Sequence, residues 1–380
     1  MKLFALDDAT CRSLAARGTP LFAYSRGAAE AQWRALRAVL PARARLAFAV
    51  KANPHPELIR LFAALGASFD CASAGELARV ADLPPGRVFY AGPGKRTSEL
   101  DVALALGARV QAEGWEDLER LEALAAGPVA VNLRVHPREG VQEGNRIIGG
   151  TGPSAFGVDE EDLPALLARA RTLQKVSIRG LHVFAASNEL SASRLLATHR
   201  HVLGMARRLQ EALGHPLEQV DLGGGLGIPY APGEPELEVE ALGRGMETLL
   251  DENPWFTGEL ILEPGRFLAG PCGVYLTRVT RVKESRGVRF AILEGGVNHL
   301  LRPLLTGQPF PVRAVDAQGP LRPATLAGPL CTSLDRLGDV DLPDLAPGTL
   351  LAFGMTGAYG FTEAMTAFLS HPVPMEVWEA

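Results

Sequence analysis

Eight short apolar runs, each followed by an amphipathic stretch, are the feature of this sequence that most constrains its fold. The runs are residues 46–50, 68–72, 87–91, 109–113, 129–135, 180–185, 219–222 and 259–262. Patterns typical of amphipathic helices lie between them, at residues 56–65, 74–81, 98–106, 115–125, 162–173, 192–213 and 239–252. Eight alternating units predict an α/β fold with one closed (β/α)8 barrel of the triosephosphate-isomerase type, because an open doubly wound sheet rarely needs so many.

From about residue 268 the pattern changes to short apolar runs separated by turns rich in glycine and proline. These runs, at residues 273–280, 288–293, 311–315 and 349–353, predict a mainly β C-terminal domain. Residues 20–25, ahead of the barrel, either pair into that sheet or form an extra strand at the barrel's edge. We therefore predict a barrel over residues 26–267 and a β domain over residues 268–380, to which residues 1–25 contribute.

Charge and cysteine usage narrow the class of partner. The 38 basic and 43 acidic side chains are well mixed, so no charged block is available for nucleic acid or an anionic membrane. Cys11, Cys71, Cys272 and Cys331 are widely spread, which is typical of reduced thiols and offers no metal site. Residues 1–8 include acidic residues, Asp7 and Asp8, where the apolar region of a secretory signal would run, and no run of about 18 apolar residues occurs. We expect a cytoplasmic protein with a small-molecule or protein partner.

Chemically useful residues follow three of the eight predicted strands. Lys51 follows the first, a glycine triplet at residues 223–225 follows the seventh, and Glu263 and Arg266 follow the eighth. In a barrel these positions share one rim, where active sites form and where the last two loops often bind phosphate. A desolvated lysine can form a Schiff base with an aldehyde, and successive backbone N–H groups can hold an anion. The alternatives are a tight turn for the glycines and a solvated rim charge for Glu263.

One cofactor, pyridoxal 5'-phosphate (PLP), explains all three features together. The lysine would hold the aldehyde carbon and the glycine loop the phosphate. The carboxylate would keep the pyridine nitrogen protonated, so that the ring can act as an electron sink.

Several motifs, in the same order along the chain, resemble those of the fold III PLP-dependent decarboxylases, which include diaminopimelate, ornithine and arginine decarboxylases. They are Phe48-Ala-Val-Lys51-Ala-Asn53, Phe69-Asp70-Cys-Ala-Ser73-Ala-Gly75-Glu76, Gly180-Leu-His182, Asp221-Leu-Gly-Gly-Gly225, Glu263-Pro-Gly-Arg266, Gly328-Pro-Leu-Cys331 and Gly357-Ala-Tyr359-Gly360. The resemblance covers nearly the whole chain and implies the alanine racemase-like fold, a barrel followed by a β domain.

The resemblance also implies roles for individual residues. Lys51 matches the Schiff-base lysine and Glu263 the partner of the pyridine nitrogen. The other implied cofactor-binding residues are Asp70, Phe184, Ser187, Gly223, Gly224, Gly225, Gly265, Arg266 and Tyr359. Cys331 matches a cysteine that the partner subunit contributes in a head-to-tail homodimer, and it is the candidate proton donor to Cα. His182 is a second catalytic candidate. The alternatives are a buried structural cysteine, a packed polar histidine and, for Asp70, an ordinary strand-end group.

Three positions depart from the family pattern and bear on the substrate. Phe184 replaces a histidine that stacks on the cofactor ring; it can still stack but cannot donate a hydrogen bond. Thr332 stands where the diaminopimelate and ornithine enzymes have an acidic residue for the distal ammonium group. Arg302 resembles the arginine that binds a distal carboxylate in diaminopimelate decarboxylases, but the tyrosine expected four residues later is Thr306. Free diamino acids are therefore poor candidate substrates, since a site built to pair a charge discriminates strongly.

Phe184 and Thr332 together resemble a less common branch of the family. It includes exosortase-associated and siderophore-pathway decarboxylases and the glutamyl-carrier-protein decarboxylase of aminoglycoside biosynthesis. The working hypothesis is α-decarboxylation of an acidic amino acid whose distal carboxyl is masked by an acyl carrier protein or in a conjugate, within a natural-product pathway. The alternatives are decarboxylation of a free, diaminopimelate-like amino acid and an amino-acid racemase. A small PLP carrier is disfavoured, because it would lack the β domain.

Overall fold

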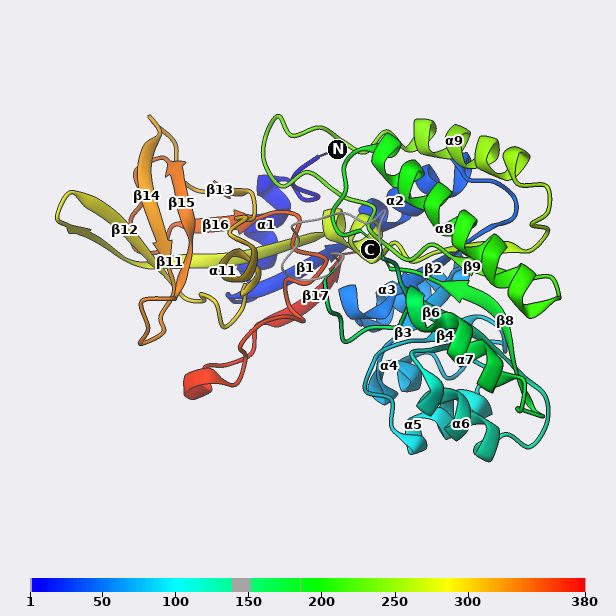
Figure 1. Ribbon diagram of the computed structural model, residues 1–380. Coiled ribbons are helices and arrows are strands. Elements are labelled where there is room, and N and C mark those ends of the chain that lie inside the picture. The colour runs from blue at the N-terminus through cyan, green and yellow to red at the C-terminus, as the bar shows by residue number, and fades with distance from the viewer. Residues whose placement is uncertain (1, 139–151, 185, 380) are drawn as a thin grey trace. The chain divides into compact units, whose positions relative to one another are not determined.

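The computed structural model describes residues 2–138, 152–184 and 186–379, which form two compact units (Figure 1). The barrel unit comprises Trp33–Gly227 and Leu237–Gly265. The β unit comprises Met1–Gln32, Ile228–Glu236 and Arg266–Ala380. Among the described residues, no helix has the length and apolar character needed to cross a membrane.

The barrel unit contains eight parallel strands that close on themselves. They are β2 (Ala44–Ala49), β3 (Ser68–Cys71), β4 (Val88–Tyr90), β5 (Arg109–Ala112), β6 (Val129–His136), β8 (Val176–His182), β9 (Gln219–Asp221) and β10 (Glu259–Leu262). Each pairs with the next in this order, and β10 pairs with β2 in the register Leu262 to Leu46, which closes the ring. The predicted (β/α)8 barrel is therefore confirmed. A two-residue strand, β7 (Val158–Asp159), pairs in parallel with the last two residues of β6.

All seven predicted barrel helices are present, with ends that differ by a few residues. They are α3 (Pro56–Ala64), α4 (Ala74–Arg79), α5 (Thr97–Ala105), α6 (Trp115–Leu124), α7 (Leu163–Ala170), α8 (Ala192–Leu213) and α9 (Val239–Glu252). Serine caps begin two of them, since the hydroxyls of Ser73 and Ser191 accept backbone N–H bonds from the first turns of α4 and α8. Gly214, in the left-handed region at φ 76°, ends α8.

Two details of the barrel differ from the predictions. The sixth strand begins at Val176, not at residue 180, because partly exposed Ser177 and Arg179 alternate with buried residues and hide the apolar run. The first strand ends one residue earlier than predicted. β2 ends at Ala49, and Val50–Ala52 form a single 3-10 turn that carries the lysine.

The β unit is built on an eight-stranded sheet. Its strands are β1 (Leu21–Ser25), β11 (Gly273–Ser285), β12 (Val288–Leu293), β13 (Val312–Ala314), β14 (Arg322–Ala327), β15 (Arg336–Leu342), β16 (Leu350–Phe353) and β17 (Met375–Glu379). Strand β1 pairs with β11 and β17, so the segment ahead of the barrel joins this sheet rather than the barrel's edge. In Figure 1, blue β1 accordingly lies beside red β17.

The sequence patterns missed several elements. They include β14, β15, β17 and the helices α1 (Asp8–Ala15), α2 (Arg26–Val39), α10 (Gly265–Ala269) and α11 (Arg302–Thr306). Strand β15 alternates buried and exposed residues, as one-sided strands do, and therefore contains no apolar run. The core of the β unit packs apolar side chains of α1 and of the central strands, including Leu14, Leu21, Leu276 and Leu350.

Candidate active site

Lys51 and Asp70 form an ion pair at the carboxyl end of β2 and β3. Asp70 pairs in register with Ala49, two residues before the lysine, so the two side chains extend from neighbouring strands. The Nζ atom of Lys51 lies 2.6 Å from Oδ2 of Asp70, whose side chain is only 1% exposed. Burial raises the pKa of Asp70, and the charge of Glu263 adds to this, while Lys51 opposes it. Asp70 is thus positioned to orient the amine of Lys51.

Glu263 follows β10 and remains an ionised carboxylate despite complete burial. Burial opposes ionisation, but interactions with His182, Lys51 and Asp221 outweigh it and lower the pKa of Glu263 to about 2. His182 Nε2 lies 3.7 Å from Glu263 Oε2, which is within ion-pair range but long for a hydrogen bond. The other oxygen, Oε1, is buried and has no hydrogen-bond partner among the described residues. Such an atom is well suited to a protonated ring nitrogen.

Asp221, at the end of β9, lies next to Glu263 and favours the neutral form. Burial and the charge of Glu263 raise its pKa well above the usual range. Its Oδ2 accepts a 2.7 Å bond from Gln111 Nε2, and its Oδ1 accepts a 2.9 Å bond from the Gly223 N–H. One negative charge is therefore concentrated on Glu263.

His182, Asp221 and Glu263 also have the spacing of a cation site. Each offers one ligand atom, and these atoms lie within 4.8 Å of one another. Both oxygens of Asp221, however, already accept hydrogen bonds from Gln111 and Gly223. This arrangement favours a hydrogen-bonded network over metal coordination.

The glycine triplet packs closely against the loop that follows β8. Gly223 and Gly225 have φ angles of 68° and 98°, in the region that favours glycine. A Cβ on Gly223 would lie 3.0 Å from the ring of Phe184, and one on Gly225 would lie 2.8 Å from Cβ of Ala186. The Phe184 ring thus lies against the glycine loop, and half-buried Ser187 belongs to the same β8–α8 connection.

Gly265, which follows the eighth strand, packs closely against the turn that carries Lys51. A Cβ at this position would lie 2.8 Å from Cβ of Ala52 and 3.0 Å from Cβ of Ala49, on either side of the lysine. The barrel rim therefore brings together Lys51, Asp70, His182 and Glu263, as well as the glycine loop with Phe184.

The remaining predicted residues belong to the β unit. Arg266 donates a 2.7 Å bond to the Tyr230 hydroxyl, and its guanidinium lies 4.9 Å from the centroid of the Tyr359 ring. Arg302 lies 5.3 Å from the same centroid, so Tyr359 contacts two arginines. Arg302 also contacts Glu363, with 3.3 Å between Nη1 and Oε2. Tyr230 and Glu363 were not singled out in the sequence, because only the fold reveals their arginine partners.

Cys331 and Thr332 lie in a turn of the β unit. Cys331 is exposed, so the alternative of a buried structural cysteine does not hold for this chain. The Thr332 hydroxyl accepts a 3.2 Å bond from the Leu334 N–H and stabilises its own turn. It is neutral, and it stands at the position where the family resemblance led us to expect an acidic residue.

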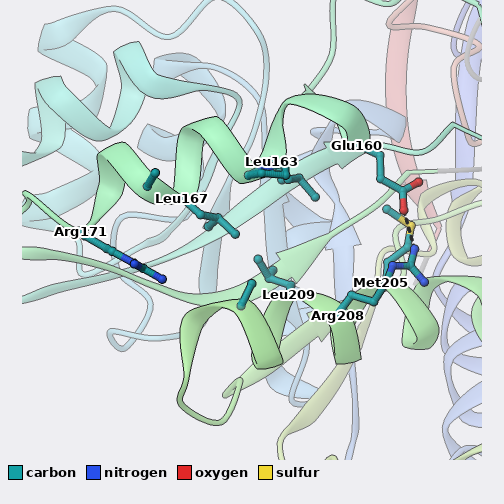
Figure 2. Close-up of a pocket in the computed structure, with 10 residues that line it drawn as sticks. Glu160, Leu163, Leu167, Arg171, Met205, Arg208 and Leu209 are labelled. Atoms are coloured by element: carbon teal, nitrogen blue, oxygen red, sulfur yellow. Dashed lines mark hydrogen bonds and ion pairs between the residues drawn. The ribbon is translucent and has the colours of Figure 1, made fainter.

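A separate cavity of about 470 Å³ lies between α7 and α8 on the outside of the barrel unit (Figure 2). Leu163, Leu167 and Leu209 line it, and the Glu160–Arg208 ion pair, 2.5 Å long, marks one end. It contains none of the rim residues and is not part of the candidate active site.

The buried, ionised Glu263 with one unbonded oxygen matches the need of a protonated pyridine nitrogen, and the rim lysine matches an aldehyde. The fold and the site thus define a PLP-dependent barrel enzyme. A family model described as "Pyridoxal-dependent decarboxylase, pyridoxal binding domain" matches residues 26–270. The chain belongs to this family, and the predictions of PLP as cofactor and of amino-acid decarboxylation are confirmed.

Individual relatives agree on this reaction class but differ in substrate. The chain is 33% identical to the L-glutamyl-(BtrI acyl-carrier protein) decarboxylase of Niallia circulans, over 98% of this chain and 91% of that protein. It is 36% identical to a diaminopimelate decarboxylase of Pseudomonas aeruginosa, over 95% and 88% of the two chains. The structure of diaminopimelate decarboxylase from Helicobacter pylori complexed with L-lysine matches with a TM-score of 0.88 at 25% identity, covering 97% and 93%.

Replacing Gly225 with alanine is expected to reduce cofactor content and to destabilise the protein by about 1–3 kcal/mol. The new Cβ would both require a strained φ and crowd Ala186. Gly214→Ala is the matched control, because Gly214 also has a positive φ but a Cβ there meets nothing within 4 Å. Urea unfolding and the PLP-to-protein ratio measure both effects. Full cofactor content in Gly225→Ala would contradict the assignment of this loop.

Proposed function

We propose that the protein decarboxylates an acidic amino acid whose distal carboxyl is masked, on an acyl carrier protein or in a conjugate, within a natural-product pathway. The observation that carries this proposal is Thr332, a neutral residue whose hydroxyl is engaged in its own turn. A free distal ammonium group would find no charged partner there. The Niallia circulans relative, a decarboxylase of a carrier-protein-bound glutamyl group, supports the same substrate class.

The residues of the barrel rim have separate tasks in this proposal. Glu263 would hold the protonated pyridine nitrogen, Phe184 would stack on the ring, and Lys51, oriented by Asp70, would hold the aldehyde carbon. Backbone N–H groups of residues 223–225 would bind the phosphate, a set to which the family resemblance adds Ser187, Gly265, Arg266 and Tyr359. When bound, PLP supplies an electron sink for the electron pair left on Cα as CO2 departs.

The protein's own groups control the charge and the proton. His182, whose Nε2 lies 3.7 Å from Glu263 Oε2, would help to keep Glu263 ionised, and the ionised carboxylate would keep the pyridine nitrogen protonated. Cys331 would give the proton to Cα after CO2 has left. Its exposure in a single chain fits a role in the site of a second copy.

A homodimer is part of the proposal. Large apolar side chains are exposed in the β unit, and a second copy would cover them. They include Leu304, Leu305, Leu321, Leu334, Met365, Phe368, Leu369, Val373 and Met375. Leu334 lies three residues from Cys331, so covering this surface would also enclose the cysteine.

Decarboxylation of free diaminopimelate is the second candidate. Arg302 favours it, because a buried guanidinium near Tyr359 resembles a site for a distal carboxylate. The Pseudomonas aeruginosa relative carries that activity in its name.

A substrate panel distinguishes these candidates. CO2 release is measured from glutamate, its γ-amide, its γ-thioester on a carrier protein, diaminopimelate and ornithine, with racemisation of the same compounds as the control reaction. We expect the γ-amide or the γ-thioester to react with the highest kcat/KM. Fastest turnover of diaminopimelate would refute the masked-substrate proposal, and racemisation without CO2 release would refute a decarboxylase role.

A further inference from the structure

The interior of the barrel contains a row of polar positions one layer below the rim. In register across neighbouring strands, the row consists of Gln111, Asn132, Gly180, Gln219 and Glu259. Gln111 and Asn132 are fully buried, and Gln219 is 7% exposed. Branched apolar side chains normally fill the interior of such barrels, and a buried amide is costly unless it is hydrogen-bonded. Three amides in this layer are therefore not explained by packing alone.

Gly180 makes room for two of these amides to bond to each other. A Cβ at this position would overlap Oδ1 of Asn132. Because β8 has no side chain here, Asn132 reaches across it, and its Nδ2 donates a 3.3 Å bond to Gln219 Oε1 on β9. Gln219 in turn donates a 3.3 Å bond to Oε2 of Glu259, the first residue of β10. Asn132 and Gln219 are thus linked to the base of the barrel.

Gln111 bonds in the opposite direction, towards the rim. Its Nε2 donates a 2.7 Å bond to Oδ2 of Asp221 on β9, and because β6 and β8 lie between β5 and β9, this bond crosses the barrel interior. The Oε1 atom of Gln111 is buried and has no hydrogen-bond partner among the residues that the structure describes. An apolar side chain would avoid that cost, so the bond to Asp221 is what the amide contributes.

Asp221 connects the two parts of the proposed cofactor site. Its Oδ1 accepts a 2.9 Å bond from the N–H of Gly223, the first residue of the glycine loop. The Gly223 carbonyl oxygen accepts a 2.8 Å bond from the Glu263 N–H. A carboxyl oxygen of Asp221 also lies within 4.8 Å of one of Glu263. A change in the orientation of Asp221 would therefore affect both Glu263 and the glycine loop.

We propose that Gln111 is a positioning residue of the active site. By holding the Asp221 carboxyl group from the far side of the barrel, it sets the orientation of Asp221 relative to Glu263 and Gly223. It thereby sets the geometry of the groups that would hold the ring nitrogen and the phosphate. This inference rests on the proposed roles of Glu263 and the glycine loop. All of its residues belong to the barrel unit.

Gln111→Leu tests the inference, because leucine is similar in size and typical of a barrel interior but cannot donate the hydrogen bond. The dissociation constant of PLP is measured by titration of the apo-protein. The phosphate of the bound cofactor is followed by its phosphorus NMR resonance, and the ring by its absorption spectrum. We expect the dissociation constant to rise about ten-fold, as the loss of one buried hydrogen bond predicts. Both spectroscopic signals are expected to shift.

Gln219→Leu is the matched control, because it removes an amide of the same row whose bonds lead away from the rim. It reports how far the loss of a buried amide disturbs the barrel in general. We expect it to leave the dissociation constant of PLP and both signals unchanged. Equal changes in the two variants would overturn the inference. PLP binding by Gln111→Leu that matches the unmodified protein would overturn it as well.

An Asp221→Ala background shows whether Gln111 acts through Asp221. In this background, the further change Gln111→Leu is expected to alter the dissociation constant of PLP by less than about two-fold, since the group that Gln111 holds is gone. Additive effects of the two changes would contradict the inference. If Asp221→Ala does not fold, the comparison of Gln111→Leu with Gln219→Leu decides.

The outcomes for Gln111 can be told apart from those for the proposed function. If Glu263→Gln and Gly225→Ala have their expected effects and Gln111→Leu has none, the positioning role alone is refuted. If Glu263→Gln and Gly225→Ala leave PLP binding and kcat unchanged, the proposed roles of those residues are refuted. A shift of both signals in Gln111→Leu, but not in Gln219→Leu, supports the inference whichever amino acid the enzyme decarboxylates.

Discussion

Lys51→Ala is expected to lower CO2 release by about 10⁴-fold or more and to abolish covalent capture of PLP. Only a primary amine can form an imine with the cofactor's aldehyde, and Lys51 supplies one at the barrel rim, 2.6 Å from buried Asp70. The direct measurement is intact mass after borohydride reduction, which fixes the cofactor to the lysine that holds it.

Two controls define what the loss in Lys51→Ala means. Lys51→Arg keeps a positive charge beside Asp70 but cannot form an imine, so it should be as inactive as the alanine variant. Lys175→Ala removes a lysine that contacts backbone oxygens of Glu122 and Ala125 and should retain the mass adduct. A cofactor adduct that persists in Lys51→Ala would place the Schiff base on another lysine.

Glu263→Gln is expected to lower kcat by about 10²- to 10³-fold while PLP remains bound. An amide cannot hold a proton on the pyridine nitrogen by charge, so the ring loses much of its capacity to accept electrons. The cofactor's absorption spectrum and single-turnover CO2 release measure the two consequences. A variant with unchanged kcat would exclude Glu263 as the partner of the ring nitrogen.

The effect of Glu263→Gln on the free energy of unfolding is expected to depend on pH. The folded pKa of Glu263, about 2, lies below its ordinary value of 4.5, so its charge contributes stability above pH 4.5. That contribution is lost as the pH falls from 4.5 towards 2. The difference in free energy of unfolding between the unmodified protein and Glu263→Gln should therefore be present at pH 6 and shrink towards pH 2. A difference that grows on acidification would contradict the direction of the pKa shift.

Neighbouring Asp221 limits how far kcat can fall in Glu263→Gln. The charge of Glu263 is one cause of the raised pKa of Asp221, and Glu263→Gln removes it. Asp221 would then ionise more easily and could compensate in part. The double variant Glu263→Gln with Asp221→Asn tests this by removing both carboxylates.

The barrel could be predicted from the sequence because its strands are buried on both faces and appear as continuous apolar runs. The predicted start of β8 was four residues too late, because Ser177 and Arg179 interrupt the apolar run of this strand. Strand β15 was missed because its residues alternate between exposed and buried positions. In β14 only the three residues 324–326 are buried, which is too short a run to stand out. Sequence periodicity thus identified strands that are buried on two sides more reliably than strands buried on one.

Some residues of the candidate site could be predicted from the sequence and others could not. Lys51, the glycine triplet and Glu263 could be predicted because each directly follows a strand, and the strand count placed them on one rim. The pairs Gln111–Asp221 and Arg302–Glu363 could not, because their members are 110 and 61 positions apart and no local pattern links them. The roles of these residues stay predictions until the variants are measured.

The sheet of the β unit joins distant parts of the chain, and this has a consequence for biosynthesis. Strand β1 runs parallel to β17 from the pair Leu21–Met375 to the pair Ser25–Glu379. The Tyr24 hydroxyl donates a 2.7 Å bond to Glu376, 352 positions away. During translation, β1 therefore emerges from the ribosome long before its partner strand exists. The residues of the barrel are synthesised in the interval. The barrel can therefore close before β1 pairs with β17.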